Sequence, residues 1–238
     1  MNVDILAIGV HPDDVELGCG GIIAKHTAKG YKVGIIDLTL GELGTRGTVE
    51  IRKKEAENGA KILGASFREN LEFRDGFFKN DEEHQLKLIA AIRKYKPKII
   101  LTNAPHDRHP DHGKAAQLTV DAAFLSGLTK IVTQENGVSQ NVWRPSVVYH
   151  YIQAYYHQPD LVVNITDSMD IKMRAVKAYS SQFHNPESNE PETLISSPEF
   201  LEFTYARALE FGLHAGFRYG EGLLTNRYIG VEDLTLLK

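Results

Sequence analysis

Residues 3–26 read VDILAIGVHPDDVELGCGGIIAKH, and this stretch decides the fold class. Residues 3–10 form a short apolar run rich in branched side chains, which predicts a buried strand. Pro12 bounds the run, and the glycines and apolar residues up to His26 predict a helix after it. A strand that feeds a helix is typical of a parallel sheet, because parallel strands need a long crossover connection between them.

The same alternation continues along the chain. Further strands are predicted at residues 32–39, 98–102, 146–152 and 161–165, and further helices at 49–63, 82–95, 113–128 and 200–213. This pattern predicts an α/β fold with a mostly parallel sheet and helices on both of its faces. Because no repeat or clear linker interrupts the pattern, residues 1–238 are expected to form a single domain. Residues 181–197, rich in Asn, Pro, Glu and Ser, are expected to form a mobile surface loop over the site.

Composition and charge narrow the class of protein. Of 238 residues, 42% are hydrophobic and 24% are charged, a globular balance that argues against disorder. Lys and Arg number 27 and Asp and Glu 31, so the net charge of −4 argues against nucleic acid or an anionic membrane as partner. No run approaches the roughly 18 apolar residues of a membrane span, and no basic leader opens the chain. The only cysteine, Cys19, cannot form an intrachain disulfide, so we expect a cytoplasmic protein with Cys19 packed in the core.

Three loops rich in charged side chains follow predicted strands. They are residues 11–16 (HPDDVE), residues 41–48 (GELGTRGT) leading to Arg52, and residues 106–112 (HDRHPDH). In an open parallel sheet the ligand site lies beyond the carboxyl ends of the strands. These loops are therefore expected to converge on one site, although they are distant in sequence.

The residue types in these loops suit a catalytic metal site. His11, Asp14 and His112 would supply the three protein ligands of an open Zn²⁺ site, and the same donors also accept Fe²⁺ or Co²⁺. Asp13 could then take a proton from water as a general base. His109 could face the opposite side of the substrate, and Asp111 is the candidate to orient the His109 ring.

Simpler interpretations exist for the same residues. Acidic residues at a helix start, here Asp13, Asp14 and Glu16, often only cap the helix and complement its dipole. A single histidine is more often structural or exposed than a metal ligand. For four other histidines the sequence indicates no partner, and they are left without a role: His150, His157, His184 and His214.

Arginines make the mouth of the expected site basic within an acidic protein. Arg46, Arg52 and Arg108 lie in or next to the three loops, which suggests that the substrate carries an anionic group. The planar fork of an arginine suits a carboxylate. The alternative is that these arginines pair with Glu42, Glu50 or Glu55 as structural ion pairs.

Taken together, these motifs resemble a known family. Residues 9–16 (GVHPDDVE), 39–42 (TLGE) and 109–112 (HPDH), with Gly47-Thr48, Arg52 and Glu55-Ala56 in the same order, are similar to the zinc-dependent N-acetylglucosaminide deacetylases of the PIG-L, or LmbE-like, family. Within the family, the deacetylases of bacillithiol biosynthesis are the most similar, on residues 41–48, 178–183 (AYSSQF) and 219–222 (YGEG).

The resemblance implies a Rossmann-like fold, homo-oligomers that include hexamers, and hydrolysis of N-acetylglucosaminyl malate to glucosaminyl malate and acetate. It implies that His11, Asp14 and His112 bind zinc and that Asp13 is the general base. It implies that His109 stabilises the tetrahedral intermediate or protonates the amine. Glu42 joins the three arginines as a candidate for substrate binding.

Other functions are compatible with the same residues. The nearest are a zinc amidase of the family that cleaves thiol S-conjugates, and a deacetylase for another N-acetylglucosaminide. A different class is a sugar- or nucleotide-binding module without catalysis, because fold does not dictate function. Asp13 and His109 argue against that class, since binding alone needs neither a base nor an acid beside a metal.

Overall fold

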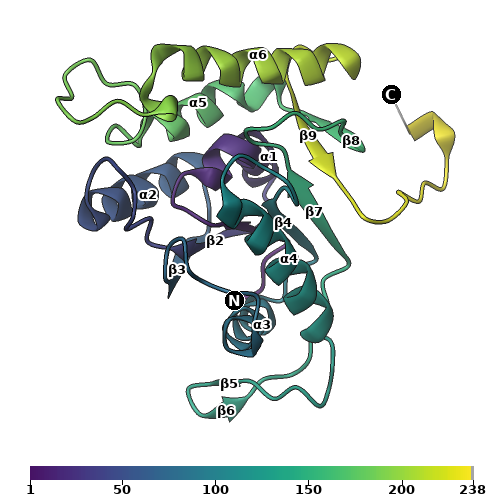
Figure 1. Cartoon of the computed structure of the whole chain (residues 1–238). Helices are drawn as coiled ribbons and strands as arrows, with labels where there is room; N and C mark the ends of the chain where they lie inside the picture. Colours follow the sequence, from purple (N-terminus) through teal and green to yellow (C-terminus); the bar gives the residue numbers. More distant parts are fainter. Residues whose placement is uncertain (237–238) are drawn as a thin grey trace.

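A seven-stranded sheet runs through the middle of the molecule, and helices cover both of its faces (Figure 1). The computed structural model describes residues 1–236. The strands, in spatial order, are β3 (Phe67–Phe73), β2 (Val33–Thr39), β1 (Ile5–Gly9), β4 (Ile99–Asn103), β7 (Val147–Tyr151), β9 (Gly220–Leu224) and β8 (Leu161–Asn164). The first five are parallel, whereas β9 runs antiparallel to β7 and to β8. The predicted α/β fold with a mostly parallel sheet is confirmed.

The helices form two layers. They are α1 (Asp14–Ala28), α2 (Val49–Leu63), α3 (Glu82–Tyr95), α4 (Pro110–Leu125), α5 (Met169–Lys177) and α6 (Pro198–His214), with short 3-10 turns at Thr166–Ser168, Leu194–Ser196 and Leu234–Leu236. Buried side chains of α1, α2 and α5 pack on one face of the sheet, and those of α3 and α4 pack on the other. A two-stranded ribbon, β5 (Gln134–Glu135) with β6 (Val138–Ser139), lies apart from the main sheet (Figure 1).

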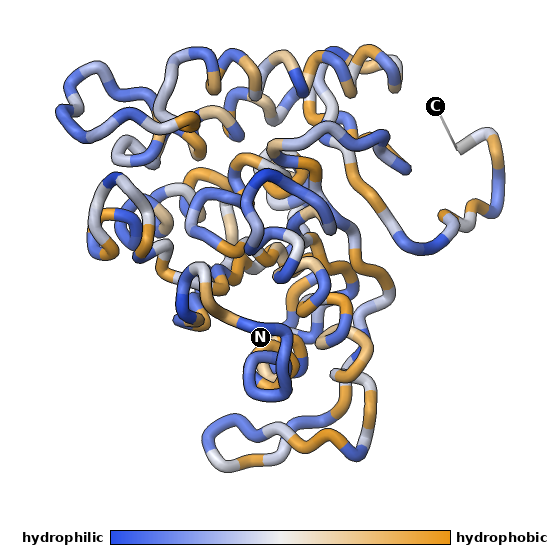
Figure 2. The backbone as a smooth tube through the Cα atoms, in the orientation of Figure 1, coloured by the Kyte–Doolittle hydropathy of each residue, from blue (hydrophilic) through white to orange (hydrophobic). Residues whose placement is uncertain are grey.

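Burial explains why the central strands were easy to predict. All residues of β1 and β2 are buried, as expected for strands that have helices on both sides. In Figure 2 the loop at the upper left, which follows α5, is hydrophilic, and hydrophobic colour gathers in the strands and inner turns of the helices. In residues 1–236 no helix is both long and apolar enough to cross a membrane.

Five elements are not predicted by the sequence: β3, β9, α5 and the two strands of the β5–β6 ribbon. β3 has the sequence FRENLEF. It has no continuous apolar run, because it is a half-exposed strand at the edge of the sheet. β9 reads GEGLL, and its glycines are needed because α6 packs closely on it: a Cβ at Gly222 would lie 2.9 Å from Phe211. Helix α5 has only nine residues, and the strands of the β5–β6 ribbon have two each.

One boundary matters for the site. The predicted helix 113–128 begins instead at Pro110 and ends at Leu125. Proline suits the first turn of a helix because its missing N–H would be unpaired there in any case. As a result His109 is the N-cap residue, and Asp111 and His112 lie in the first turn of α4.

Candidate active site

The three predicted loops meet at one cavity of about 310 Å³ beyond the carboxyl ends of the parallel strands. Eight of the ten candidate residues line it: His11, Asp13, Asp14, Arg46, Arg52, Arg108, His109 and His112. Glu42 and Asp111 do not. Residues 193–195 form part of the wall, so the 181–197 segment does border the site.

Asp14 is held rigidly at the centre of this site. One carboxylate oxygen, Oδ2, accepts hydrogen bonds from the backbone N–H of Val10 (3.1 Å) and His11 (3.0 Å) and from the side-chain amide of Asn103 (3.2 Å). The other, Oδ1, accepts one from Nε2 of Gln153 at 2.8 Å. The Asp14 carboxylate is therefore hydrogen-bonded to the end of β1, the end of β4 and the segment after β7. It does not accept a hydrogen bond from the first turn of α1, so it is not a helix cap.

The two histidines next to Asp14 each have a second carboxylate behind them. His11 Nε2 lies 3.0 Å from Asp75 Oδ1, and His112 Nδ1 lies 2.8 Å from Asp107 Oδ2. An ionised carboxylate can only accept a hydrogen bond, so these two nitrogens carry the protons. In the neutral imidazoles the lone pairs then lie on His11 Nδ1 and His112 Nε2, which are 3.6 Å and 3.3 Å from the Asp14 carboxylate oxygens.

These two separations, which run to different oxygens of Asp14, can be compared with those around a zinc ion. Two ligand atoms about 2.1 Å from a tetrahedral zinc lie about 3.4 Å apart, which is close to both measured separations. Two sets of three donors have ligand atoms within 4.8 Å of one another: His11 with His109 and His112, and His11 with Asp75 and Asp111. Asp14 accepts four hydrogen bonds, and the Asp75 and Asp111 carboxylates accept hydrogen bonds as well, so the ligand set of His11, Asp14 and His112 stays a prediction.

The carboxylates beside His11 and His112 favour the protonated form of both imidazoles. Burial alone would lower the pKa of His11, but its contacts with Asp14 and Asp75 raise it to about 10. Burial likewise opposes the charge on His112, and Asp14 and Asp107 raise its pKa to about 9. The Asp14 pKa is held well below its ordinary value against burial, because His112 and His11 lie beside it.

Asp13 has the properties expected of a base and not those of a helix cap. It occupies the N-cap position of α1, but its side chain makes no capping hydrogen bond. Its backbone φ of 131° is uncommon for a residue with a side chain and is the kind of strain found at functional sites. Oδ2 accepts a hydrogen bond from Arg52 at 3.1 Å. Burial raises the pKa of Asp13 and Arg52 lowers it, with a balance at about 7.

The structure corrects the role predicted for Asp111. Its carboxylate accepts hydrogen bonds from the backbone N–H of Gly76 (2.8 Å) and from Lys114 (2.7 Å), and it does not touch the His109 ring. Instead the backbone N–H of Asp111 donates to His109 Nδ1 at 3.3 Å, because His109 is the N-cap of α4. The His109 ring is thus oriented by the helix start, with its centroid 4.6 Å from that of His11. Burial and the neighbouring histidines lower the pKa of His109.

The four candidates for substrate binding have different environments. Arg52 is buried and donates to Asp13 and to the carbonyls of Pro12 and Gly41, so its charge is paired inside the protein, though not with the glutamates considered above. Arg46 donates to Ser181, Ser188 and Pro191, and it fastens the 181–197 segment to the 41–48 loop. Glu42 accepts from the backbone N–H of Asp75 and so supports the partner of His11.

Arg108 is different from the other two arginines. It is exposed at the rim of the cavity, and within residues 1–236 its guanidinium makes no hydrogen bond or ion pair. Of the three arginines predicted to meet an anionic substrate group, only Arg108 therefore offers its guanidinium to a ligand.

Several supporting residues were missed from the sequence. Asp75 follows β3, a strand without a clear signal, whereas Asn103 ends β4 and Gln153 follows β7. Asp107 lies in the third loop, residues 106–112. Their common signal is their place just after a parallel strand, which would have been visible for Asn103, Asp107 and Gln153.

Comparison with known proteins identifies the family. The model of the PIG-L family, described as GlcNAc-PI de-N-acetylase, matches residues 6–123. A diacetylchitobiose deacetylase of Thermococcus kodakarensis is 32% identical over 229 residues, covering 92% of this chain and 81% of that protein. The chain belongs to the PIG-L family.

As a PIG-L family N-deacetylase, the protein is a metal-dependent amide hydrolase. The conserved protein TT1542 of Thermus thermophilus, whose structure is solved, is 35% identical in sequence to this chain. The two structures superpose with a TM-score of 0.85 over 97% of this chain and 98% of that one. A probable N-acetyl-alpha-D-glucosaminyl L-malate deacetylase 2 of Bacillus cereus is 30% identical over 200 residues, covering 76% of this chain and 84% of that protein. The chain is thus similar to a bacillithiol-type deacetylase, as expected. Its identity to the diacetylchitobiose deacetylase is slightly higher, at 32% against 30%.

Proposed function

We propose that this PIG-L family protein removes the N-acetyl group of an N-acetylglucosaminide, releasing acetate and the free amine. One observation carries the proposal: a two-histidine, one-aspartate donor set lies in the same cavity as a second, strained aspartate. A binding module would need neither the donor set nor the strain at Asp13.

We assign His11, Asp14 and His112 to hold a divalent cation, with zinc as the first candidate and Fe²⁺ or Co²⁺ as alternatives. Such an ion supplies Lewis-acid polarisation of the acetamide carbonyl. Asp13, with a pKa near 7, accepts the proton of the attacking water, and Arg52 keeps its carboxylate in place. His109, oriented by the start of α4, donates a proton to the departing amine or a hydrogen bond to the developing oxyanion.

For the finer choice of substrate we propose N-acetylglucosaminyl malate. Arg108 supports it, because an exposed arginine at the rim without a partner in residues 1–236 suits the malate carboxylates. Diacetylchitobiose, an uncharged substrate, is the main alternative, because the relative of that name covers most of the chain. A thiol S-conjugate would require the same chemistry on a different amide.

The test is acetate release from purified protein with N-acetylglucosaminyl malate, diacetylchitobiose, N-acetylglucosamine and a thiol S-conjugate. We expect release that stops with a chelator and returns with Zn²⁺. The malate conjugate should have the highest kcat/KM. Release of no acetate from any of these by metal-loaded protein would contradict deacetylation, whereas a preference for diacetylchitobiose would contradict only the malate assignment.

We also propose that the active form is a homo-oligomer acting on a free small molecule. Light scattering after size-exclusion chromatography gives the molar mass directly. A mass equal to one chain of 26.6 kDa at micromolar concentration would contradict the assembly and leave the chemistry untouched.

A further inference from the structure

Residues 153–155, which follow β7 after Ile152, contact Asp14 and also Asp107, the partner of His112. The side chain of Gln153 donates to Asp14 Oδ1 at 2.8 Å. The backbone N–H groups of Ala154 (3.2 Å) and Tyr155 (2.7 Å) donate to Asp107 Oδ1, and the other oxygen of Asp107 accepts from His112. Three consecutive residues thus reach Asp14 directly and His112 through Asp107.

Gln153 completes the hydrogen bonding of Asp14. The three donors on Oδ2 come from residues near the ends of β1 and β4, and they hold one end of the carboxylate. Oδ1 lies 3.3 Å from His112 Nε2, and in residues 1–236 the side chain that donates a hydrogen bond to Oδ1 is Gln153. Gln153 therefore adds a fourth donor to the carboxylate, and it acts on the oxygen that faces His112.

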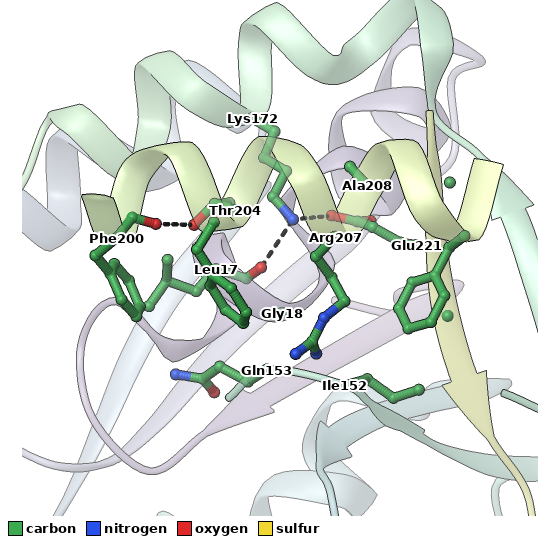
Figure 3. Close-up of a pocket in the computed structure, with 14 residues that line it drawn as sticks. Leu17, Gly18, Ile152, Gln153, Lys172, Phe200, Thr204, Arg207, Ala208 and Glu221 are labelled. Atoms are coloured by element: carbon green, nitrogen blue, oxygen red, sulfur yellow. Dashed lines mark hydrogen bonds and ion pairs between the residues drawn. The ribbon is translucent and has the colours of Figure 1, made fainter. Parts of the chain in front are cut away.

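Helix α6 holds this segment from the other side. The Arg207 guanidinium donates to the carbonyl of Ala154 (3.0 Å) and to that of Tyr155 (3.2 Å), and it lies 4.7 Å from the centre of the Phe203 ring. Figure 3 shows Arg207 reaching down from α6 toward Ile152 and Gln153, which follow β7. The rigid, planar fork of arginine suits two neighbouring carbonyls.

We propose that residues 153–155 form a bracket that aligns the two sides of the metal site, with Gln153 and Arg207 as positioning residues. The proposal rests on the assignment of Asp14 and His112 as metal ligands. Both positioning residues lie outside residues 6–123, the part that the family model matches. Residues in the C-terminal half of the chain would therefore set the metal affinity of ligands in the N-terminal half.

The first test is Gln153→Met, which keeps the side-chain length but removes the donor. Loss of a group that orients a metal ligand typically weakens metal binding about 10- to 100-fold, and we expect that loss in zinc affinity, measured by competition with a chromophoric chelator. Gln140→Met is the matched control, because Gln140 also makes one hydrogen bond, to the Ala90 carbonyl, with its Oε1 buried and unpartnered among the described residues.

Gln153→Ala guards against a folding defect, since it removes the same donor without adding an apolar tail. Circular dichroism and thermal unfolding of the zinc-free variants would show whether they fold. A folded variant of either kind that binds zinc as tightly as the wild type would overturn the role of Gln153. Zinc affinity that falls equally in Gln140→Met would overturn it as well.

Arg207→Gln tests the outer part of the bracket. It should weaken zinc binding in the same direction but by less than Gln153→Met, because it acts through the backbone. Arg144→Gln is the control: Arg144 donates to the Phe124 carbonyl and lies 4.3 Å from that ring. Combined with Gln153→Met, Arg207→Gln should add less than its separate effect, because both changes release the same segment.

Unchanged zinc affinity in Arg207→Gln would remove α6 from the proposal. A folded wild-type chain that takes up no divalent metal would instead contradict the proposed function, and the bracket with it. The two failures are therefore distinguishable by the wild-type measurement alone.

Discussion

Glu221 caps helix α1 at Gly21, 200 positions earlier in the chain. Its carboxylate accepts hydrogen bonds from the backbone N–H of Gly21 (3.0 Å) and Ile22 (2.7 Å). These N–H groups need a partner because Cys19 leaves the helical conformation (φ −144°, ψ 19°) and interrupts the helix. Lys172 Nζ, 2.6 Å from Glu221 and 2.8 Å from the Leu17 carbonyl, balances the buried charge, as Figure 3 shows. The antiparallel strand β9 thereby stabilises the helix that carries Asp14.

Glu221→Gln should lower the free energy of unfolding by about 3–5 kcal/mol, because it leaves the Lys172 ammonium buried without its counter-charge. Urea denaturation followed by circular dichroism measures the change. Glu83→Gln is the control: Glu83 pairs with Lys87 on the surface of α3, where an ion pair contributes only about 0–1 kcal/mol. Similar losses for the two variants would show that the buried pair has no special role.

His11→Ala, Asp14→Ala and His112→Ala should each lose bound metal and deacetylase activity together, since each removes one of three ligands. Metal content per chain after gel filtration gives the answer. His84→Ala is the control. It removes an imidazole whose Nδ1 lies 2.6 Å from Asp81 Oδ1, outside the cavity, and the variant should retain metal. Full occupancy in all three ligand variants would refute the assignment.

Asp13→Asn should keep both the fold and the metal while turnover falls by about 10²- to 10⁴-fold, the usual cost of losing a general base. Asparagine has nearly the same shape as aspartate, so the substitution adds no backbone strain at this position. His109→Ala should behave in the same way. Single-turnover assays at saturating zinc separate the chemical step from metal loss, and near-normal turnover in either variant would remove it from the mechanism.

Arg108 and Arg52 should respond differently to alanine. Arg108→Ala should reduce kcat/KM for N-acetylglucosaminyl malate far more than for N-acetylglucosamine, by about 10- to 150-fold, because a lost charge-assisted contact costs roughly 1.5–3 kcal/mol. Arg52→Ala should reduce both substrates to a similar extent, since Arg52 holds Asp13 and two loop carbonyls. A selective effect of Arg52→Ala alone would reverse the two roles.

Most of the sheet could be predicted from the sequence because its central strands are buried on both faces. Continuous apolar runs at residues 3–10, 32–39 and 98–102 are direct consequences of that burial. The edge strand β3 and the glycine-containing β9 lacked such a run. Their place in the sheet depends on the neighbouring strands and on α6, which no local pattern describes.

The sequence by itself determined the class of fold, because hydrophobic periodicity can be read locally. It also determined which residues meet at the site, because loops that follow parallel strands converge at one edge of the sheet. Only the tertiary structure decided what each side chain does there. Asp111 bonds to Gly76 and Lys114 and not to the His109 ring, Arg52 and Arg46 are paired within the protein, and Asp75, Asp107 and Gln153 hold the ligands. The physical reason is that hydrogen-bond partners are set by distances between segments far apart in the chain, and these distances exist only after the sheet has formed.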